Sequence, residues 1–82
     1  MVTVSYHHYF EKQVRKIKNE ELKQRIKIQI QKIIEDPEVG KPMRFGRKGT
    51  RELYISPFRL SYLYEREHDR VVLLSFYHKD EQ

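Results

Sequence analysis

The stretch TRELYISPFRLSYLYEREHDRVVLLSFYH, residues 50–78, decides the fold of this chain. Its first half alternates apolar and polar residues, which is typical of strands that bury one face. The charged turn REHDR then leads into VVLLSFYH, which is almost wholly apolar and suits a central strand covered on both faces. Because the connections are short, neighbouring strands are expected to be antiparallel. The predicted meander comprises strands at 50–56, 59–66 and 70–78.

The N-terminal segment predicts one more strand and a helix. VTVSY, residues 2–6, has β-branched residues in apolar–polar alternation and predicts a short strand. A helix is expected to begin near residue 6 or 7, with Ser5 as its cap. Phe10, Val14 and Ile17 recur at spacings of four and three, which places them on one face of that helix.

A second amphipathic helix is expected between Asn19 and Pro37. Asn19 can end the first helix or cap the second, and Pro37 disfavours helix in the residue before it. Ile28 falls outside the apolar stripe of this helix, whose members are Leu22, Ile26, Ile30, Ile33 and Ile34. The order β-α-α-β-β-β in a single domain over residues 1–82 predicts an α+β fold. A helical hairpin is expected to pack on a small antiparallel sheet.

Composition limits the classes of protein that this chain can represent. Its 82 residues suffice for one small domain. The absence of cysteine excludes a disulfide framework and a thiolate metal site. The N-terminus has no signal-peptide pattern, and no apolar run approaches the ~20 residues of a membrane helix. We therefore expect a cytoplasmic protein with no membrane association.

The positive charge is concentrated in one segment. The net charge is +5, and residues 40–64 contain six basic side chains and one acidic side chain. Basic and acidic residues are equal in number over the rest of the chain. A basic patch of this kind favours a polyanion or an acidic protein as the partner. The basic residues are Lys41, Arg44, Arg47, Lys48, Arg51 and Arg59.

Several stretches resemble the RelE/ParE superfamily, the small toxins of bacterial and archaeal toxin–antitoxin pairs. FRLSYLYE is similar to the central hairpin of the RelE branch, and Arg59 matches the arginine of that hairpin. The strand end Tyr77-His78-Lys79 is similar to the Tyr-His-Tyr ending of the YoeB-like branch, with Lys79 at the place of the last tyrosine. GKPMRFGRKG resembles the YoeB-like loop, but Met43 stands where that branch has a glutamate.

This resemblance implies a RelE-like microbial ribonuclease fold and ribosome-dependent cleavage of messenger RNA. It also implies a RelB-like antitoxin that covers the basic face in a heteromeric toxin–antitoxin complex. The ParE branch shares the fold but acts on DNA gyrase without cleaving RNA. Because the fold alone does not decide function, a gyrase inhibitor or an inactive binding protein is the alternative.

The candidate catalytic residues are Arg59 and the end of the last strand. RNA cleavage of this type needs a base for the 2′-proton, an acid for the leaving 5′-oxygen and cations for the phosphate. His78 is the first choice for acid or base because imidazole exchanges protons near neutrality, with Lys79 and Tyr77 as alternates. Successive strand residues point to opposite faces, so a regular strand places only one of Tyr77 and His78 in the site. Arg59 can grip a phosphate or form a salt bridge with a neighbouring glutamate.

The other basic residues are expected to bind the RNA backbone, which makes binding sensitive to salt. They are Lys41, Arg44, Arg47, Lys48 and Arg51. Phe45 and Tyr54 can stack on bases or pack under the loop. Met43 leaves the expected carboxylate base missing, and Glu52 can substitute for it. No cofactor or metal is expected, because the histidines show no metal-ligand spacing.

Overall fold

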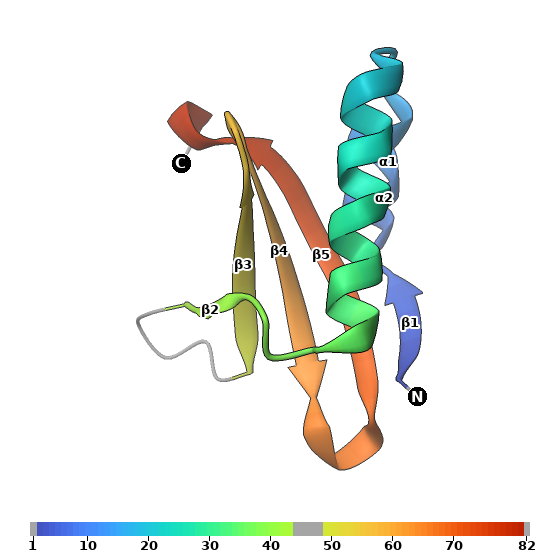
Figure 1. The fold of residues 1–82 in the computed structure, drawn as a ribbon, viewed down its shortest axis with the longest axis vertical. Coiled ribbons are helices and arrows are strands. Elements are labelled where there is room, and N and C mark those ends of the chain that lie inside the picture. The colour runs from blue at the N-terminus through green and yellow to red at the C-terminus, as the bar shows by residue number, and fades with distance from the viewer. Residues whose placement is uncertain (1, 44–48, 82) are drawn as a thin grey trace.

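The computed structural model describes residues 2–43 and 49–81. Figure 1 shows the elements in chain order from blue to red. They are β1 (Thr3–Tyr6), α1 (His8–Arg15), α2 (Glu20–Glu35), β2 (Lys41–Pro42), β3 (Thr50–Ile55), β4 (Phe58–Glu65), the 3-10 helix η1 (Arg66–His68), β5 (Arg70–His78) and the 3-10 helix η2 (Lys79–Glu81). The predicted α+β class is confirmed, and the short strand β2 is an addition to the predicted order.

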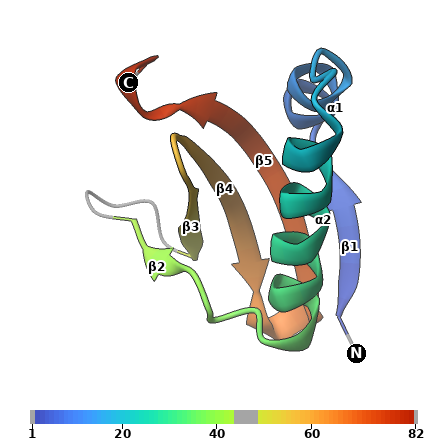
Figure 2. The same cartoon turned by 45° about the horizontal axis from the view of Figure 1, so that its top comes forward.

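The strands form one sheet in the order β1-β5-β4-β3-β2. The neighbours from β2 to β5 are antiparallel, so the predicted meander is confirmed. Figure 2 shows the pronounced curvature of β4 and β5. β1 is instead parallel to β5, with Thr3 opposite Arg70 and Tyr6 opposite Leu73. The expectation of a purely antiparallel sheet is therefore wrong at this edge, because a long crossover through the helices permits a parallel neighbour.

The helix starts follow from local hydrogen bonds. The cap of α1 is His7, whose Nδ1 accepts a 3.1 Å bond from the backbone N–H of Tyr9. Ser5, the predicted cap, lies in β1 opposite Val72 and is not at the helix start. Asn19 caps α2 as predicted, since its Oδ1 accepts a 3.0 Å bond from the backbone N–H of Leu22. In the described part of the chain, no helix combines the length and apolarity needed to cross a membrane.

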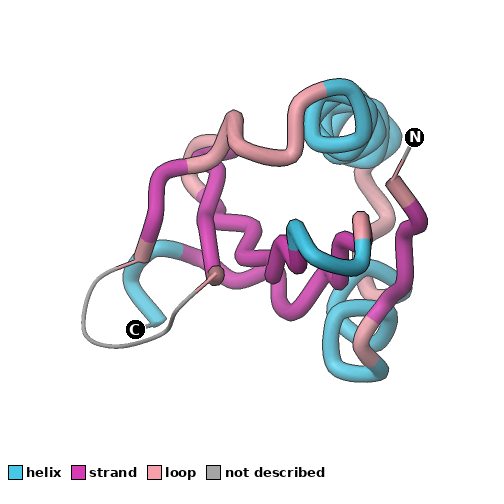
Figure 3. The backbone as a smooth tube through the Cα atoms, turned by 90° about the horizontal axis from the view of Figure 1, so that it is seen from below, coloured by secondary structure: helices cyan, strands magenta, loops and turns pink. Residues whose placement is uncertain are grey.

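The hydrophobic core lies between the helices and one face of the sheet. Figure 3 shows α2 over this face and its connection running across to β2. The helices contribute Phe10, Ile26 and Ile33, and burial of each such side chain stabilises the fold by roughly 1.5–3 kcal/mol. Ile28 is 54% exposed, in agreement with its position outside the apolar stripe. The sheet contributes Ile55, Leu60, Tyr62, Val71, Leu73 and Phe76.

β5 is fully covered on one face only. Val71 and Leu73 are buried, whereas Val72 between them and Leu74 after them keep intermediate exposure. The prediction of a strand covered on both faces is therefore wrong. The helices pack on the core face, and the opposite face of the meander, here called the open face, is left for other contacts.

A polar clasp fixes the segment between α2 and β2. The fully buried Tyr62 donates from Oη to the carbonyl of Pro37 at 2.8 Å and accepts from the N–H of Gly40 at 2.9 Å. Arg51 donates to the carbonyls of Glu38 and Gly40 at 2.9 and 2.7 Å. Because these bonds satisfy backbone groups of an irregular segment, they hold β2 against β3.

Candidate functional site

A polar array occupies the open face of the meander. Strand register places Tyr54 opposite Arg59 and Arg59 opposite Tyr77, which makes one row across the sheet. Residues on opposed strands that face each other directly point to the same side of a sheet. The neighbouring row on the same face, two residues further along each strand, is Lys41, Glu52, Ser61 and Ser75.

Glu52 joins the two rows. Its Oε1 lies 3.6 Å from Nη1 of Arg59, and its Oε2 accepts a 3.4 Å hydrogen bond from Oη of Tyr77. Both contacts are longer than is usual for charge-assisted bonds, which measure about 2.7–2.9 Å from a nitrogen donor and about 2.5–2.7 Å from a hydroxyl donor. The side chains of Arg59 and Glu52 are 33% and 27% exposed. A phosphate can therefore approach the guanidinium without breaking a tight ion pair.

Two further features border this cluster. Ser61 and Ser75 form a hydrogen bond between their Oγ atoms at 2.5 Å. Beside the array, a pocket of about 380 Å³ opens along the β2 edge of the sheet, and its lining residues are Val39, Lys41, Glu52, Leu53, Tyr54 and Arg59. The pocket thus combines cationic, anionic and aromatic groups at one place.

The end of β5 separates the predicted catalytic residues. Tyr77 lies in the polar array, whereas His78 lies opposite Phe58 on the core face, as strand alternation predicts. The rings of His78 and Phe58 meet edge to face at 5.5 Å. The His78 Nδ1 accepts a 3.2 Å bond from the backbone N–H of Asp80. Lys79 is exposed in η2.

The predicted RNA-binding residues fall into three groups. Lys41 is exposed and lines the pocket of the open face. Arg51 points to the core face, where the clasp to residues 38–40 occupies its guanidinium. The remaining residues lie outside the described part of the chain, together with Phe45; they are Arg44, Arg47 and Lys48.

Sequence reasoning underestimated Glu52 and missed the serine pair. The half-buried Met43 donates from its backbone to Thr50 at 3.0 Å and brings no acid to the site. Glu52 supplies the carboxylate instead. The signal was available in the alternation along each strand, because Glu52 and Tyr54 share one face of β3, just as Arg59 and Ser61 share one face of β4.

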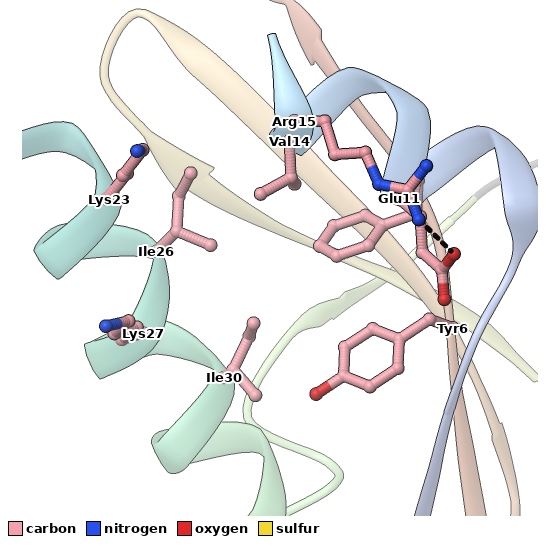
Figure 4. Close-up of a pocket in the computed structure, with 9 residues that line it drawn as sticks. Tyr6, Glu11, Val14, Arg15, Lys23, Ile26, Lys27 and Ile30 are labelled. Atoms are coloured by element: carbon pink, nitrogen blue, oxygen red, sulfur yellow. Dashed lines mark ion pairs between the residues drawn. The ribbon is translucent and has the colours of Figure 1, made fainter. Parts of the chain in front are cut away.

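A second, apolar site lies between the two helices. Figure 4 shows Val14 of α1 facing Ile26 and Ile30 of α2 across a groove of about 380 Å³, with Tyr6 at one end. Charged side chains form the rim, where Glu11 pairs with Arg15 at 3.7 Å. The other rim residues are Lys23 and Lys27.

Within the described residues, no group of three histidine, aspartate or glutamate side chains is placed to hold a metal ion.

Comparison with known proteins identifies the family. Residues 4–82 match the model of the ParE toxin of type II toxin–antitoxin systems, parDE. No curated protein sequence matches the chain significantly.

Solved structures share the fold. The toxin–antitoxin complex RelBE2 from Mycobacterium tuberculosis contains a chain with 26% identity and a TM-score of 0.79, covering 95% of this chain and 98% of that one. The intact E. coli RelBE complex gives 19% identity, a TM-score of 0.80 and coverage of 95% and 96%. The isolated E. coli RelE toxin gives 18% identity, a TM-score of 0.82 and coverage of 95% and 84%. The chain therefore belongs to the ParE toxin family of type II toxin–antitoxin systems, within the RelE/ParE superfamily that its sequence resembles.

Proposed function

We propose that this toxin cleaves messenger RNA on the ribosome through attack of a 2′-hydroxyl on the adjacent phosphate. The observation that carries the proposal is the meeting of Arg59, Glu52 and Tyr77 on the open face. A cation, a carboxylate and a phenol within one cluster are the group types that this reaction needs. An inhibitor that only binds a protein has no need of this combination.

Each residue of the cluster has a role in the proposed reaction. Glu52 takes the proton of the 2′-hydroxyl as its oxygen forms a bond to phosphorus. The bond from phosphorus to the 5′-oxygen breaks, and Tyr77 donates its proton to that oxygen. The products are a 2′,3′-cyclic phosphate and a 5′-hydroxyl. Arg59 stabilises the charge that develops on the phosphate oxygens, and Lys41 binds the RNA backbone.

His78 and Lys79 remain alternates for the acid. His78 faces Phe58, so its imidazole reaches the phosphate only if the end of β5 turns over. Tyr77 already donates to Glu52, which favours it as the acid without movement of the strand. Lys79 is exposed in η2, beyond the end of the strand.

The second candidate is inhibition of DNA gyrase without RNA cleavage. The match of residues 4–82 to the ParE family model favours it, because the resemblance to the ParE branch implies gyrase as the target. In that case the open face binds protein and Glu52 has no proton to transfer. A gyrase supercoiling assay with the wild-type toxin separates this candidate from the nuclease.

The test of the nuclease is primer extension on a defined message bound to programmed ribosomes. The wild-type toxin is expected to cut within the decoding site. Tyr77→Phe is expected to slow the cut by ~10²-fold or more, because it removes the proposed acid, while His78→Ala is expected to keep most of the rate. The reverse ranking would assign the proton to His78. Intact message with folded wild-type toxin would reject the nuclease and favour the gyrase candidate.

We further propose that the groove between α1 and α2 binds the antitoxin. Its floor is apolar, and its charged rim is net positive, because Arg15, Lys23 and Lys27 outnumber Glu11. An antitoxin segment with apolar residues flanked by acidic ones complements both features. The groove lies away from the polar array, so it anchors the antitoxin without using the catalytic residues.

Two isoleucines of α2 provide a matched test of this docking site. Ile30 lines the groove, whereas Ile28 is 54% exposed and lies outside it. Ile30→Glu and the charge reversal Lys27→Glu are expected to weaken binding of the cognate antitoxin by at least ~10-fold, since hot-spot residues contribute most of an interface's energy. Ile28→Glu is expected to leave calorimetric affinity unchanged. Equal weakening by both isoleucine variants would place the antitoxin elsewhere.

A further inference from the structure

Large apolar side chains remain exposed beside the cluster of Arg59 and Glu52. Tyr54 is 55% exposed and Val39 is 40% exposed, and both line the pocket at the β2 edge. The core uses the other face of β3, through Leu53 and Ile55. The ring of Tyr54 therefore contributes little to the stability of the described fold.

Tyr54 and Lys41 are both available to a ligand. In the part of the chain that the structure describes, the Tyr54 hydroxyl has no hydrogen-bond partner and its ring meets no other ring. Within the same residues, the ammonium of Lys41 forms no ion pair. The pocket thus offers an aromatic face and a cation that no described intramolecular contact uses.

The strand register sets the distance between these groups. Tyr54 lies directly opposite Arg59, and the Cβ atoms of such a pair are about 4.5–5.5 Å apart. A phosphate bound to Arg59 therefore brings its own nucleoside within reach of the Tyr54 ring. Planar apolar faces joined by anionic phosphates are the features of single-stranded nucleic acid that aromatic residues and cations recognise together.

We propose that this pocket binds one unstacked base of a single-stranded RNA, with the base stacked on Tyr54 and the next phosphate on Lys41. The inference rests on the proposed function, because it places the scissile phosphate on Arg59. Val39 closes the apolar wall beside the base. Since every base has a π-face, Tyr54 holds and orients the nucleotide without selecting a sequence.

The test is an NMR titration of the full chain with a trinucleotide RNA that carries 2′-O-methyl groups and cannot be cleaved. Tyr54→Ala is expected to raise the Kd about five- to hundredfold, and Tyr54→Phe is expected to stay within about twofold because it keeps the ring. Tyr9→Ala is the matched control, because Tyr9 is a tyrosine of α1 with a similar exposure of 48%. It is expected to leave the Kd unchanged.

The outcomes separate this inference from the proposed function. The base-binding role of the pocket is rejected if wild type and Tyr54→Ala bind the trinucleotide with equal affinity, or if folded wild type does not bind it. Cleavage on ribosomes that needs Arg59 but is indifferent to Tyr54→Ala also overturns this role, while the nuclease stands. Binding that depends on Tyr54 in a protein that leaves messages intact supports the pocket and rejects the nuclease.

Discussion

The two faces of the meander carry the same residue types and use them differently. On the core face, Arg51 and Tyr62 bind backbone groups of residues 37–40 at 2.7–2.9 Å. On the open face, Arg59 and Tyr77 share the carboxylate of Glu52 at 3.6 and 3.4 Å. Short bonds to backbone leave a side chain no capacity for a ligand, whereas long contacts to one shared carboxylate can be exchanged. The comparison distinguishes Arg51, whose guanidinium is held by backbone carbonyls, from Arg59, whose guanidinium can exchange its contact for a ligand.

Glu52→Gln provides the largest expected effect. The glutamine amide cannot take the 2′-proton, so the rate of cleavage on programmed ribosomes is expected to fall ~10²–10⁴-fold. The matched control is Glu38→Gln, which alters the carboxylate beside Arg51 and Arg66 on the other side of the sheet. That variant is expected to cleave at the wild-type rate. Full cleavage activity of the Glu52→Gln toxin would contradict the assignment of Glu52 as the general base.

The two arginines separate activity from stability. Arg59→Ala is expected to slow cleavage ~10²–10³-fold, because one donor to the developing phosphate charge is lost. Arg51→Ala is expected to lower the free energy of unfolding by about 1–3 kcal/mol, because the carbonyls of Glu38 and Gly40 lose their donor. Primer extension and urea unfolding of both variants measure the contrast. Loss of cleavage activity in Arg51→Ala at an unchanged free energy of unfolding would contradict the structural role assigned to Arg51.

Gly40→Ala tests how tightly the clasp is packed. A Cβ at Gly40 would lie 2.7 Å from Oη of Tyr62 and 2.9 Å from the carbonyl of Glu52. Overpacking of this kind is expected to cost about 1–3 kcal/mol in urea unfolding. Combining it with Tyr62→Phe removes one of the two clashing oxygens, so the two costs are expected to be less than additive. Additive changes in the free energy of unfolding would show that Gly40→Ala is accommodated without a clash with the Tyr62 hydroxyl.

Tyr62 gives the smallest effect and a pH signature. Burial raises the pKa of its phenol above the ordinary value of 10.0, although the Gly40 hydrogen bond and the charge of Arg51 oppose this rise. The folded pKa exceeds the unfolded one. The contribution of the neutral Tyr62 phenol to the free energy of unfolding is therefore complete below about pH 10 and is lost as the pH rises through the folded pKa. Tyr62→Phe is expected to lose about 1 kcal/mol at neutral pH and to show a weaker decline above pH 10. The same dependence of unfolding free energy on pH for wild type and Tyr62→Phe would contradict the raised pKa of Tyr62.

Local patterns predicted the elements better than the site. The period of two located β3 and β4, a nearly continuous apolar run located β5, and the spacing of apolar residues located α2, because these signals depend only on neighbouring residues. The meeting of Glu52 with Tyr77 depends on the register of three strands, including an irregularity between Ser61 and Tyr62. No short-range pattern contains that register. Alternation already places Arg51 on the face of Leu53 and Ile55, but only the packing of residues 38–40 against β3 shows that its guanidinium is occupied.

The parallel pairing of β1 with β5 has a consequence for the time course of synthesis. Thr3 pairs with Arg70, so the edge of the sheet joins residues 67 positions apart (70 minus 3). Contacts this distant close slowly and only after the later partner has been made. A chain that stops at Asp69 lacks both the neighbour of β1 and the phenol of Tyr77, and is expected to show little ordered structure in circular dichroism. On the proposed mechanism, a nascent chain therefore lacks its active site until the last strand is translated, and an antitoxin made before that point can bind the site as it first assembles.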